Sequence, residues 1–241
     1  MGGVLKAALN GNRSSDEHPN TPITPGQLAQ AARAAVEAGA DALHFHPRNV
    51  AGVESLDAED VAAALEAVRA ACPGVPVGLS SGWWILPDTR ARLAAVRAWT
   101  ALPDFVSVNW QEDGAPELAA ALLERGIGVE AGLWTAEAVQ AFLTWPRRDE
   151  VLRVLVEMPD QPIRTYKAEL QEMFALLDAS GLDKPVVLHG LGESAWPLLR
   201  EAARRGLDAR IGLEDTLLLP GDFDGAADNA ELVRVAREMM E

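Results

Sequence analysis

Strand-like apolar runs alternate with helix-periodic segments along the whole chain, and this alternation limits the folds open to it. The runs are short and continuously apolar, as expected of parallel strands covered by protein on both faces. The segments between them are rich in Ala and Leu, and together they make eight strand–helix units. The predicted strands are Val4–Leu9, Ala40–His46, Val75–Leu79, Phe105–Asn109, Ile127–Ala131, Val151–Met158, Val186–His189 and Ala209–Leu213. The predicted helices are 25–38, 57–71, 87–99, 115–125, 135–144, 166–179, 195–205 and 225–240.

Residues at the boundaries of these units support the division. Thr24-Pro25 is typical of a helix N-cap followed by proline at the first helical position. Eight units in 241 residues favour a closed barrel over an open doubly wound sheet, and no GxGxxG follows the first strand. We therefore predict an α/β fold, a (β/α)8 TIM barrel, as a single domain over residues 1–241. A glycine typical of helix C-termini separates helix from strand at Gly39, Gly126, Gly181 and Gly206.

Charge and cysteine content exclude several classes of function. The net charge is −15 and the pI is about 4.7, so we expect neither nucleic acid nor a membrane surface as a partner. The single cysteine, Cys72, excludes an internal disulfide and a cysteine-based metal site. We see no secretory apolar region and no run approaching 18 apolar residues, which predicts a cytoplasmic protein.

Two histidines stand two residues apart where the second predicted strand ends. Residues two apart on a strand point to the same side, so His44 and His46 project together. Catalytic groups of a barrel lie at this end of its strands, and zinc favours imidazole nitrogen. A hydrogen-bonded pair of core histidines is the alternative. A catalytic zinc usually has three protein ligands, and Glu214 at the end of the eighth strand is the third candidate, unless it stabilises a following turn.

Other polar residues also follow predicted strands. Gly190 and Gly192 can admit a phosphate through their backbone amides, or can form a plain tight turn. Arg48 can hold a substrate carboxylate, or can be solvated or ion-paired. Glu157 at the end of the sixth strand can face the site, although a structural ion pair is the favoured interpretation.

The chain resembles the β-keto acid cleavage enzymes, the family of the 3-keto-5-aminohexanoate cleavage enzyme. The motifs are HxHxR at 44–48, the run Arg210–Asp215 and the segment Asp228–Val233, and the resemblance runs from Ala8 to about Arg237. It implies a zinc-bound TIM barrel, and a homo-oligomer, either a tetramer or a dimer. It also implies that a β-keto acid reacts with acetyl-CoA to give acetoacetate and a new acyl-CoA, by Claisen and retro-Claisen chemistry.

The same resemblance implies roles for individual residues. His44, His46 and Glu214 match the zinc ligands. Arg210 and Asp215 match an arginine–aspartate pair that acts as base machinery. The remaining matches are Ser80 in an STGG-like element, Ser107 and Asn109 in an SxN element, and Glu130 at the end of strand five.

These roles make chemical sense. A β-keto acid offers a carboxylate and a ketone that zinc can polarise, and Ser80 and Ser107 can donate hydrogen bonds to a thioester oxygen. The phosphates of CoA are then the expected ligand of Gly190 and Gly192. A neighbouring Arg210 should lower the pKa of Asp215, which would make it a weak base.

The departures from the family pattern concern the substrate. Arg13 stands near the position of an acidic residue that handles the substrate amine, which favours a neutral or anionic side group. Asn49 replaces an aspartate, Trp83 and Trp84 follow Ser80-Ser81-Gly82, and Trp110 replaces a small residue. A zinc-dependent barrel lyase or aldolase that does not use CoA is the second hypothesis. A non-catalytic metal-binding barrel is the third, and complete retention of the predicted site argues against it.

Overall fold

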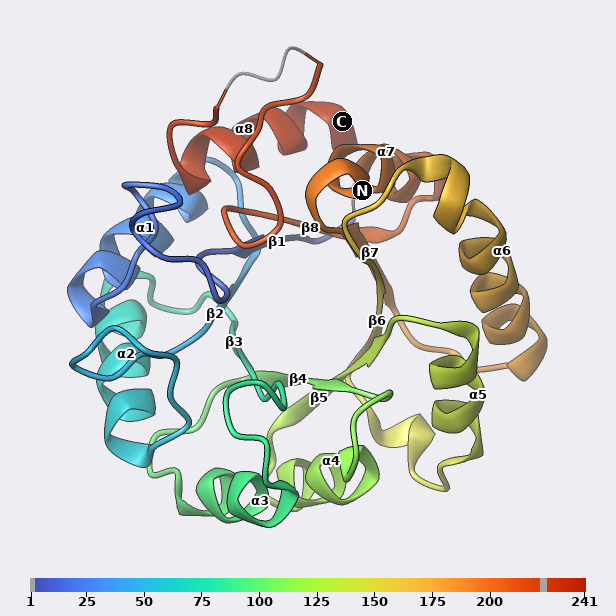
Figure 1. Ribbon diagram of the computed structural model, residues 1–241, viewed down its shortest axis with the longest axis horizontal. Helices are drawn as coiled ribbons and strands as arrows, with labels where there is room; N and C mark the ends of the chain where they lie inside the picture. Colours follow the sequence, from blue (N-terminus) through green and yellow to red (C-terminus); the bar gives the residue numbers. More distant parts are fainter. Residues whose placement is uncertain (1–2, 222–224) are drawn as a thin grey trace.

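The chain forms a closed barrel of eight parallel strands in the order β1 to β8, with β8 paired to β1 (Figure 1). The computed structural model describes residues 3–221 and 225–241. This closure confirms the predicted (β/α)8 TIM barrel. The strands are β1 (Leu5–Ala8), β2 (Ala42–Phe45), β3 (Val77–Ser80), β4 (Phe105–Asn109), β5 (Gly128–Leu133), β6 (Arg153–Met158), β7 (Val186–Gly190) and β8 (Asp208–Ile211).

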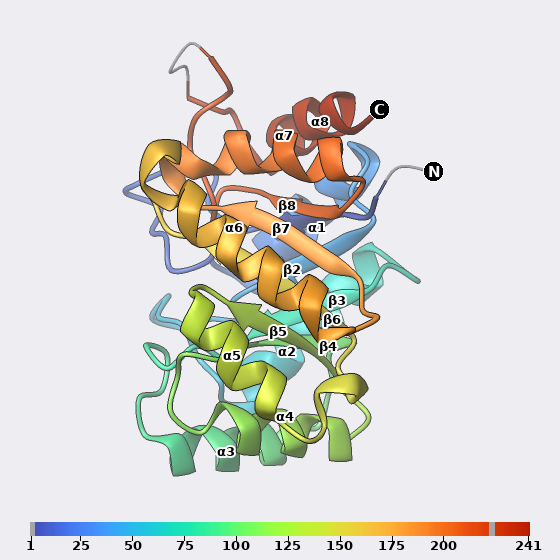
Figure 2. The same cartoon turned by 90° about the vertical axis from the view of Figure 1, so that its right-hand side faces the viewer.

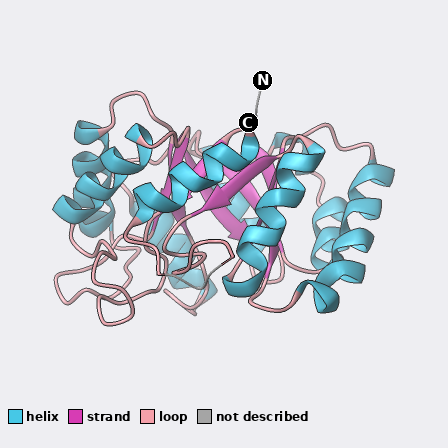
Figure 3. Cartoon of the chain, turned by 90° about the horizontal axis from the view of Figure 1, so that it is seen from above, coloured by secondary structure: helices cyan, strands magenta, loops and turns pink. Residues whose placement is uncertain are grey.

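Among the described residues, eight α-helices surround the strands, and the side views show them as an outer layer (Figures 2 and 3). Every predicted helix is confirmed, with the largest differences at the starts of α6 and α8. No helix within the described ranges is long and apolar enough to cross a membrane. The helices are α1 (Pro25–Glu37), α2 (Ala58–Ala71), α3 (Thr89–Ala98), α4 (Ala115–Glu124), α5 (Ala136–Thr144), α6 (Ile163–Ser180), α7 (Ala195–Arg205) and α8 (Asn229–Met240).

Local chemistry explains where α1 begins. The Thr24 side chain accepts a hydrogen bond from the Gln27 backbone N–H, and the Gln27 side chain accepts one from the Thr24 backbone N–H. This capping box satisfies backbone N–H groups that a helix N-terminus otherwise leaves without a partner, and Pro25 has no backbone N–H to satisfy. At the other end of a helix, Gly206 after α7 adopts φ 67°, the left-handed conformation expected of a C-terminal glycine.

An ionic cluster fills the middle of the barrel. The fully buried Glu130 carboxylate on β5 pairs with Lys6 on β1 and, at 2.6 Å, with Arg153 on β6. The Phe105 ring packs under both cations and covers Gly78, where an added Cβ would lie 2.0 Å from the ring. We call Lys6, Glu130, Arg153 and Phe105 the barrel floor, because the candidate site lies above them at the carboxyl ends of the strands.

Candidate active site

A cavity of about 180 Å³ opens at the carboxyl ends of the strands, where barrel enzymes carry their active sites. Its wall brings together side chains that are up to 202 positions apart, from Asn12 to Glu214. The predicted site residues that line it are His44, His46, Ser80, Ser107, Asn109, Arg210 and Glu214.

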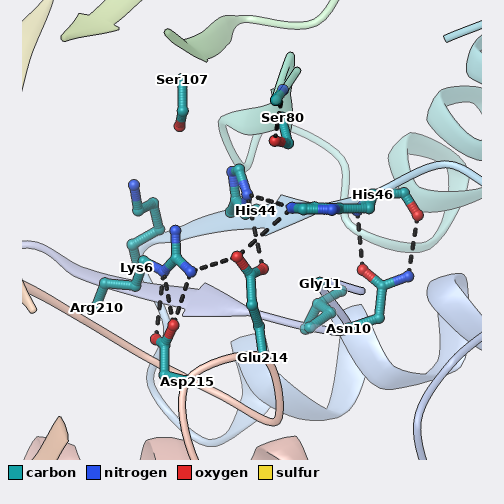
Figure 4. A network of polar contacts seen from close by, with 12 residues as sticks. Lys6, Asn10, Gly11, His44, His46, Ser80, Ser107, Arg210, Glu214 and Asp215 are labelled. Carbon is teal, nitrogen blue, oxygen red and sulfur yellow. Dashed lines mark hydrogen bonds and ion pairs between the residues drawn. The ribbon is translucent and has the colours of Figure 1, made fainter. Parts of the chain in front are cut away.

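Three of these side chains converge as metal ligands would (Figure 4). The Nε2 atoms of His44 and His46 lie 3.3 Å apart. The Glu214 carboxylate oxygens lie 3.7 Å from His44 Nε2 and 3.5 Å from His46 Nε2. Glu214 comes from the turn that follows β8, three residues beyond the end of that strand. Two imidazole nitrogens and one carboxylate oxygen around one point are the donor set of a catalytic zinc site.

Neighbouring residues orient His46. Its backbone N–H donates to Asn10 Oδ1 at 2.8 Å, and Asn10 Nδ2 donates to its carbonyl at 3.0 Å (Figure 4). Its ring Nδ1 lies 2.5 Å from Glu54 Oε1, and the Trp84 indole N–H donates to the same oxygen at 3.2 Å. The Trp84 ring also stacks on the imidazole, with centroids 6.3 Å apart. Because Glu54 engages Nδ1, Nε2 is the nitrogen directed at the metal position.

The electrostatics of this trio fit a bound cation. Burial lowers the pKa of His44 well below its usual value, which keeps the imidazole neutral as metal binding requires. Burial alone would lower the pKa of His46, but the Glu214 and Glu54 carboxylates raise it to about 9, so a metal would have to displace a proton from this imidazole. Burial opposes ionisation of Glu214 too, but Arg210 and the two histidines hold its pKa well below the usual range. Glu214 Oε2 and His44 Nδ1 are buried without a hydrogen-bond partner among the described residues, and a metal would satisfy the Glu214 oxygen.

Arg210 joins the candidate metal ligands to Asp215. Its Nη2 donates to Asp215 Oδ1 at 2.7 Å and also bonds Glu214. Asp215 is fully buried and lies beside the cavity wall, behind Arg210, with His189 Nδ1 3.6 Å from its Oδ1. Burial raises the pKa of Asp215 above its ordinary value, and this outweighs the opposing effect of Arg210. Arg210 lowers the pKa of Asp215 as expected, but the expectation left out desolvation, which acts in the opposite direction and is larger.

The two predicted oxyanion donors differ in what their hydroxyls already do. Ser80 Oγ accepts a hydrogen bond from the Gly82 N–H at 3.2 Å, which leaves its own proton available. Ser107 Oγ donates to Glu130 at 2.8 Å, so its proton is engaged by the barrel floor. Asn109 Nδ2 donates to Glu112 at 2.7 Å, and its carbonyl oxygen lies close to Gly132. Only Ser80 of the two serines is arranged to donate to a substrate.

Glu130 and Arg48 lie away from the cavity, contrary to their predicted roles. Glu130 is the third residue of β5 rather than its last, and it forms the barrel floor beneath Ser107. The Arg48 guanidinium donates to the backbone carbonyls of Gly11, Arg13 and Gly52. Arg48 thus holds two loops together, which argues against its predicted contact with a substrate carboxylate.

The loop after β7 does not offer the predicted phosphate site. The Gly192 N–H donates to the Asp215 carbonyl at 2.7 Å, with Gly192 at φ 54°. The Glu193 N–H donates to the Asp160 carboxylate at 2.8 Å. Gly190 lies at the end of β7 and packs against Ser194. A carboxylate already occupies the place expected for an anion, which argues against CoA phosphate binding at Gly190 and Gly192.

Several residues of the wall were not among the predicted site residues, namely Asn12, Trp84, Trp134, Leu155, Glu157 and Leu191. Trp84 was noted as a departure from the family pattern, and Glu157 was expected either to face the site or, as the favoured interpretation, to form a structural ion pair. Glu157 and Leu155 have the spacing of two that places both inside the barrel, which is a signal the sequence does contain. Trp110, by contrast, packs against Phe142 and Trp145 in the core.

The position of Arg13 removes the first reason for doubting an amino substrate. Arg13 pairs with Glu17 at 3.2 Å and lines a separate cavity between the loops after β7 and β8. Its neighbour Asn12 is the residue that reaches the wall of the site. The side group of a substrate in this site would therefore not meet Arg13.

Solved structures share the fold but differ widely in sequence. The α subunit of tryptophan synthase from Legionella pneumophila superposes with a TM-score of 0.59 at 13% identity, covering 99% of this chain and 92% of that chain. Thiamine phosphate pyrophosphorylase from Pyrococcus furiosus gives 0.57 at 12% identity, covering 99% and 95%. At such identities the likeness concerns the barrel alone.

Sequence relatives point to one family. A 3-keto-5-aminohexanoate cleavage enzyme from Fusobacterium nucleatum is 24% identical over 98% of this chain and 92% of its own length. An enzyme of the same name from Acetoanaerobium sticklandii is 21% identical with the same coverage. A 3-oxoadipate:acetyl-CoA acetyltransferase from Cupriavidus necator is 33% identical over 33% of this chain and 28% of its own. The model of the beta-keto acid cleavage enzyme family matches residues 3–241, and the chain belongs to that family.

Proposed function

We propose that this enzyme binds one zinc ion through His44, His46 and Glu214 and exchanges a β-keto acid with acetyl-CoA, to give acetoacetate and a new acyl-CoA. The observation that carries the proposal is the convergence of these three ligand atoms beside Arg210 in one cavity. Membership of the β-keto acid cleavage family supports the reaction class, and one relative's name includes acetyl-CoA.

The donor set suits chemistry at a ketone. A bound zinc would polarise the substrate ketone and stabilise the enolate that forms next to it. The Arg210 guanidinium, which lines the cavity, can hold the same negative charge. We propose that Asp215 takes the proton from the carbon between the two carbonyls, since its raised pKa favours proton acceptance. Arg210 must then move aside, and catalytic hydrogen bonds commonly rearrange when substrate binds.

The remaining steps form and break bonds at the substrate carbon and at the CoA sulfur, and every atom is accounted for. The deprotonated carbon attacks the thioester carbonyl of acetyl-CoA, and the CoA thiolate leaves. The thiolate adds to the original ketone, the bond between ketone and central carbon breaks, and acyl-CoA forms. The proton held by Asp215 returns to the released carbanion, which becomes acetoacetate. Ser80 can donate to the thioester oxygen while that carbon is tetrahedral.

Incubation of zinc-loaded protein with a panel of β-keto acids, with and without acetyl-CoA, tests the proposal. We expect acetoacetate and acyl-CoA to appear together, and only when acetyl-CoA is present. Cleavage of a keto acid without acetyl-CoA would instead identify a CoA-independent lyase. Absence of turnover with every keto acid, in protein that carries its metal, would contradict the proposed reaction.

A further inference from the structure

Glu157 faces the cavity from the wall opposite the two histidines. It is the fifth residue of β6 and lines the same cavity as the metal ligands. In the closed order β1 to β8, β6 lies four strands from β2 in either direction, so the two strands face each other across the barrel (Figure 1). A β-keto acid held at His44 and His46 by its carboxylate and ketone therefore directs its side group toward β6.

The Glu157 carboxylate lies beside a buried histidine but is not satisfied by a hydrogen bond. His189 Nε2 lies 2.9 Å from Glu157 Oε2, yet this nitrogen is buried without a hydrogen-bond partner among the described residues. Within residues 3–221 and 225–241, no hydrogen bond reaches Glu157 Oε1 either. The side chain is 8% exposed, and the cavity is what it borders. Its neighbours on this wall, Leu155 and Trp134, present mainly apolar surface.

Substrate binding changes the surroundings of Glu157 Oε1, and the side group of the substrate determines whether this oxygen has a hydrogen-bond partner. A side group that fills the cavity displaces the water that solvates Oε1. An alkyl group would leave a carboxylate oxygen buried without a partner, which is strongly unfavourable. A carboxylate would add repulsion between like charges where screening is weak. A hydrogen-bond donor on the side group avoids both penalties.

The charges inside the barrel favour an uncharged donor over an ammonium group. Three cations and three carboxylates line the cavity or form the floor beneath it, counted by formal charge among the described residues with imidazoles neutral, as they would be when a metal is bound. A divalent metal adds two positive charges, and the carboxylate of the keto acid reduces this surplus to one. An ammonium group would raise the surplus to two again in a partly buried site, whereas a hydroxyl group would leave it unchanged. The six groups counted are Lys6, Arg153, Arg210, Glu130, Glu157 and Glu214.

We propose that Glu157 is a specificity-determining residue that selects β-keto acids with a hydroxyl on the side group, by accepting a hydrogen bond from that hydroxyl. The inference rests on the proposed function, because it requires the keto acid to be held at the metal ligands. It names a substrate class that the family assignment leaves open.

Four keto acids of equal chain length test it: 5-hydroxy-3-oxohexanoate, 3-oxohexanoate, 5-amino-3-oxohexanoate and 3-oxoadipate. We expect kcat/KM for the hydroxy compound to exceed that for the alkyl compound about 10- to 100-fold, and to exceed those of the other two. The hydroxy-to-alkyl ratio should fall to about one in Glu157→Leu. It should fall only in part in Glu157→Gln, which keeps one acceptor oxygen. A ratio within one variant is independent of how much of that variant is folded.

Leu155→Val is the matched control, because it changes the same wall without removing a polar group. It should leave the hydroxy-to-alkyl ratio unaltered. A ratio unchanged in Glu157→Leu, with all four rates reduced alike, would overturn the inference and indicate a structural or proton-transfer role. If that variant does not fold, an unchanged ratio in Glu157→Gln is equally decisive. Preference of the wild type for the ammonium or the alkyl compound would also overturn it.

Calorimetry separates this inference from the proposed reaction. Each keto acid is titrated into zinc-loaded protein without acetyl-CoA, and the dissociation constants are compared. Tighter binding of the hydroxy compound by about 10-fold or more, without acetoacetate formation, would uphold the role of Glu157 while the exchange reaction fails. Equal binding of all four, or binding of none, would overturn the role of Glu157 whatever the reaction.

Discussion

The barrel interior contains two charged layers that differ in how their charges are matched. In the floor, Glu130 accepts hydrogen bonds from Lys6, Ser107 and Arg153, and it is completely buried. In the layer above, His44, His46 and Glu214 crowd their ligand atoms together, and Glu214 Oε2 has no hydrogen-bond partner among the described residues. The Glu130 carboxylate of the floor is thus satisfied by the protein itself, although the floor has two cations for this one carboxylate and Arg153 Nη2 is buried without a hydrogen-bond partner among the described residues. Glu214 Oε2 in the upper layer would gain a partner only when something binds.

This difference separates stability from function. Breaking a buried ion cluster leaves charges without partners and destabilises the fold. Substitution of His44, His46 or Glu214, whose ligand atoms lie close together without a ligand between them, should change the stability of the metal-free protein little and should strongly reduce activity. The predictions below test that division, from the largest expected effect to the smallest.

The double variant His44→Ala, His46→Ala should lose its metal completely, because one remaining carboxylate cannot hold zinc against solvent. Elemental analysis of purified protein should give about one zinc per wild-type chain and none per variant chain. Thermal unfolding of the metal-free forms should show that both proteins fold. Full zinc occupancy in the variant would place the metal elsewhere.

Substitutions of the adjacent carboxylates Glu214 and Asp215 should differ in their effect on zinc content. Asp215→Asn should lower turnover by about 10²- to 10⁴-fold and keep its zinc, since it removes a proton acceptor and no ligand. Glu214→Gln should lose most of the metal. Turnover of the β-keto acids and zinc content, measured on both variants, decide the matter. Normal turnover in Asp215→Asn would direct attention to Glu157 as the base.

Glu130→Gln should destabilise the floor by about 3–5 kcal/mol, because Lys6 and Arg153 would keep their buried charges without a counter-charge. Urea unfolding of the metal-free protein measures the change. Glu150→Gln removes an exposed partner of Arg147 and should have little effect, which makes it the matched control. Equal unfolding curves for wild type and Glu130→Gln would mean that the floor does not determine stability.

The stabilities of the wild type and of Glu130→Gln should become more similar at acid pH. Burial opposes ionisation of Glu130, but Lys6 and Arg153 hold its pKa far below the usual value of 4.5. The folded protein therefore binds fewer protons than the unfolded chain, so the stabilisation is present above pH 4.5 and declines as the pH falls below it. Urea unfolding at several pH values should show the gap between wild type and variant shrinking in that range. A gap that widens in acid would reverse the assignment.

Glu54→Gln should weaken zinc binding by roughly 10-fold, since outer partners of a ligating histidine tune its basicity and orientation. Competition with a chromophoric chelator measures the affinity. Trp84→Phe keeps the stacked ring but loses the N–H bond to Glu54, and should have a smaller effect. Glu59→Gln, which removes an exposed carboxylate on α2, serves as the control. Unchanged affinity in Glu54→Gln would leave His46 oriented by Asn10 alone.

The sequence by itself predicted the barrel and the histidine pair of the candidate metal site, and the family resemblance added Glu214. Hydrophobic periodicity and the residues that begin or end a helix are properties of short sequence segments. They located the elements within a few residues, through the apolar runs, the capping residues Thr24 and Gln27, and the glycine after α7. The spacing of His44 and His46 is likewise local, because the strand geometry alone directs both rings to one side.

Tertiary structure decided what the remaining polar residues do. Arg48, Ser107 and Glu130 have the same residue types as substrate-binding groups, yet backbone carbonyls and the floor engage them first. Asp215 became a stronger base than its neighbour Arg210 suggested, because desolvation depends on everything packed around a group. Neighbours distant in sequence, such as His189, which lies 2.9 Å from Glu157, meet only once the barrel closes, and no local pattern encodes them.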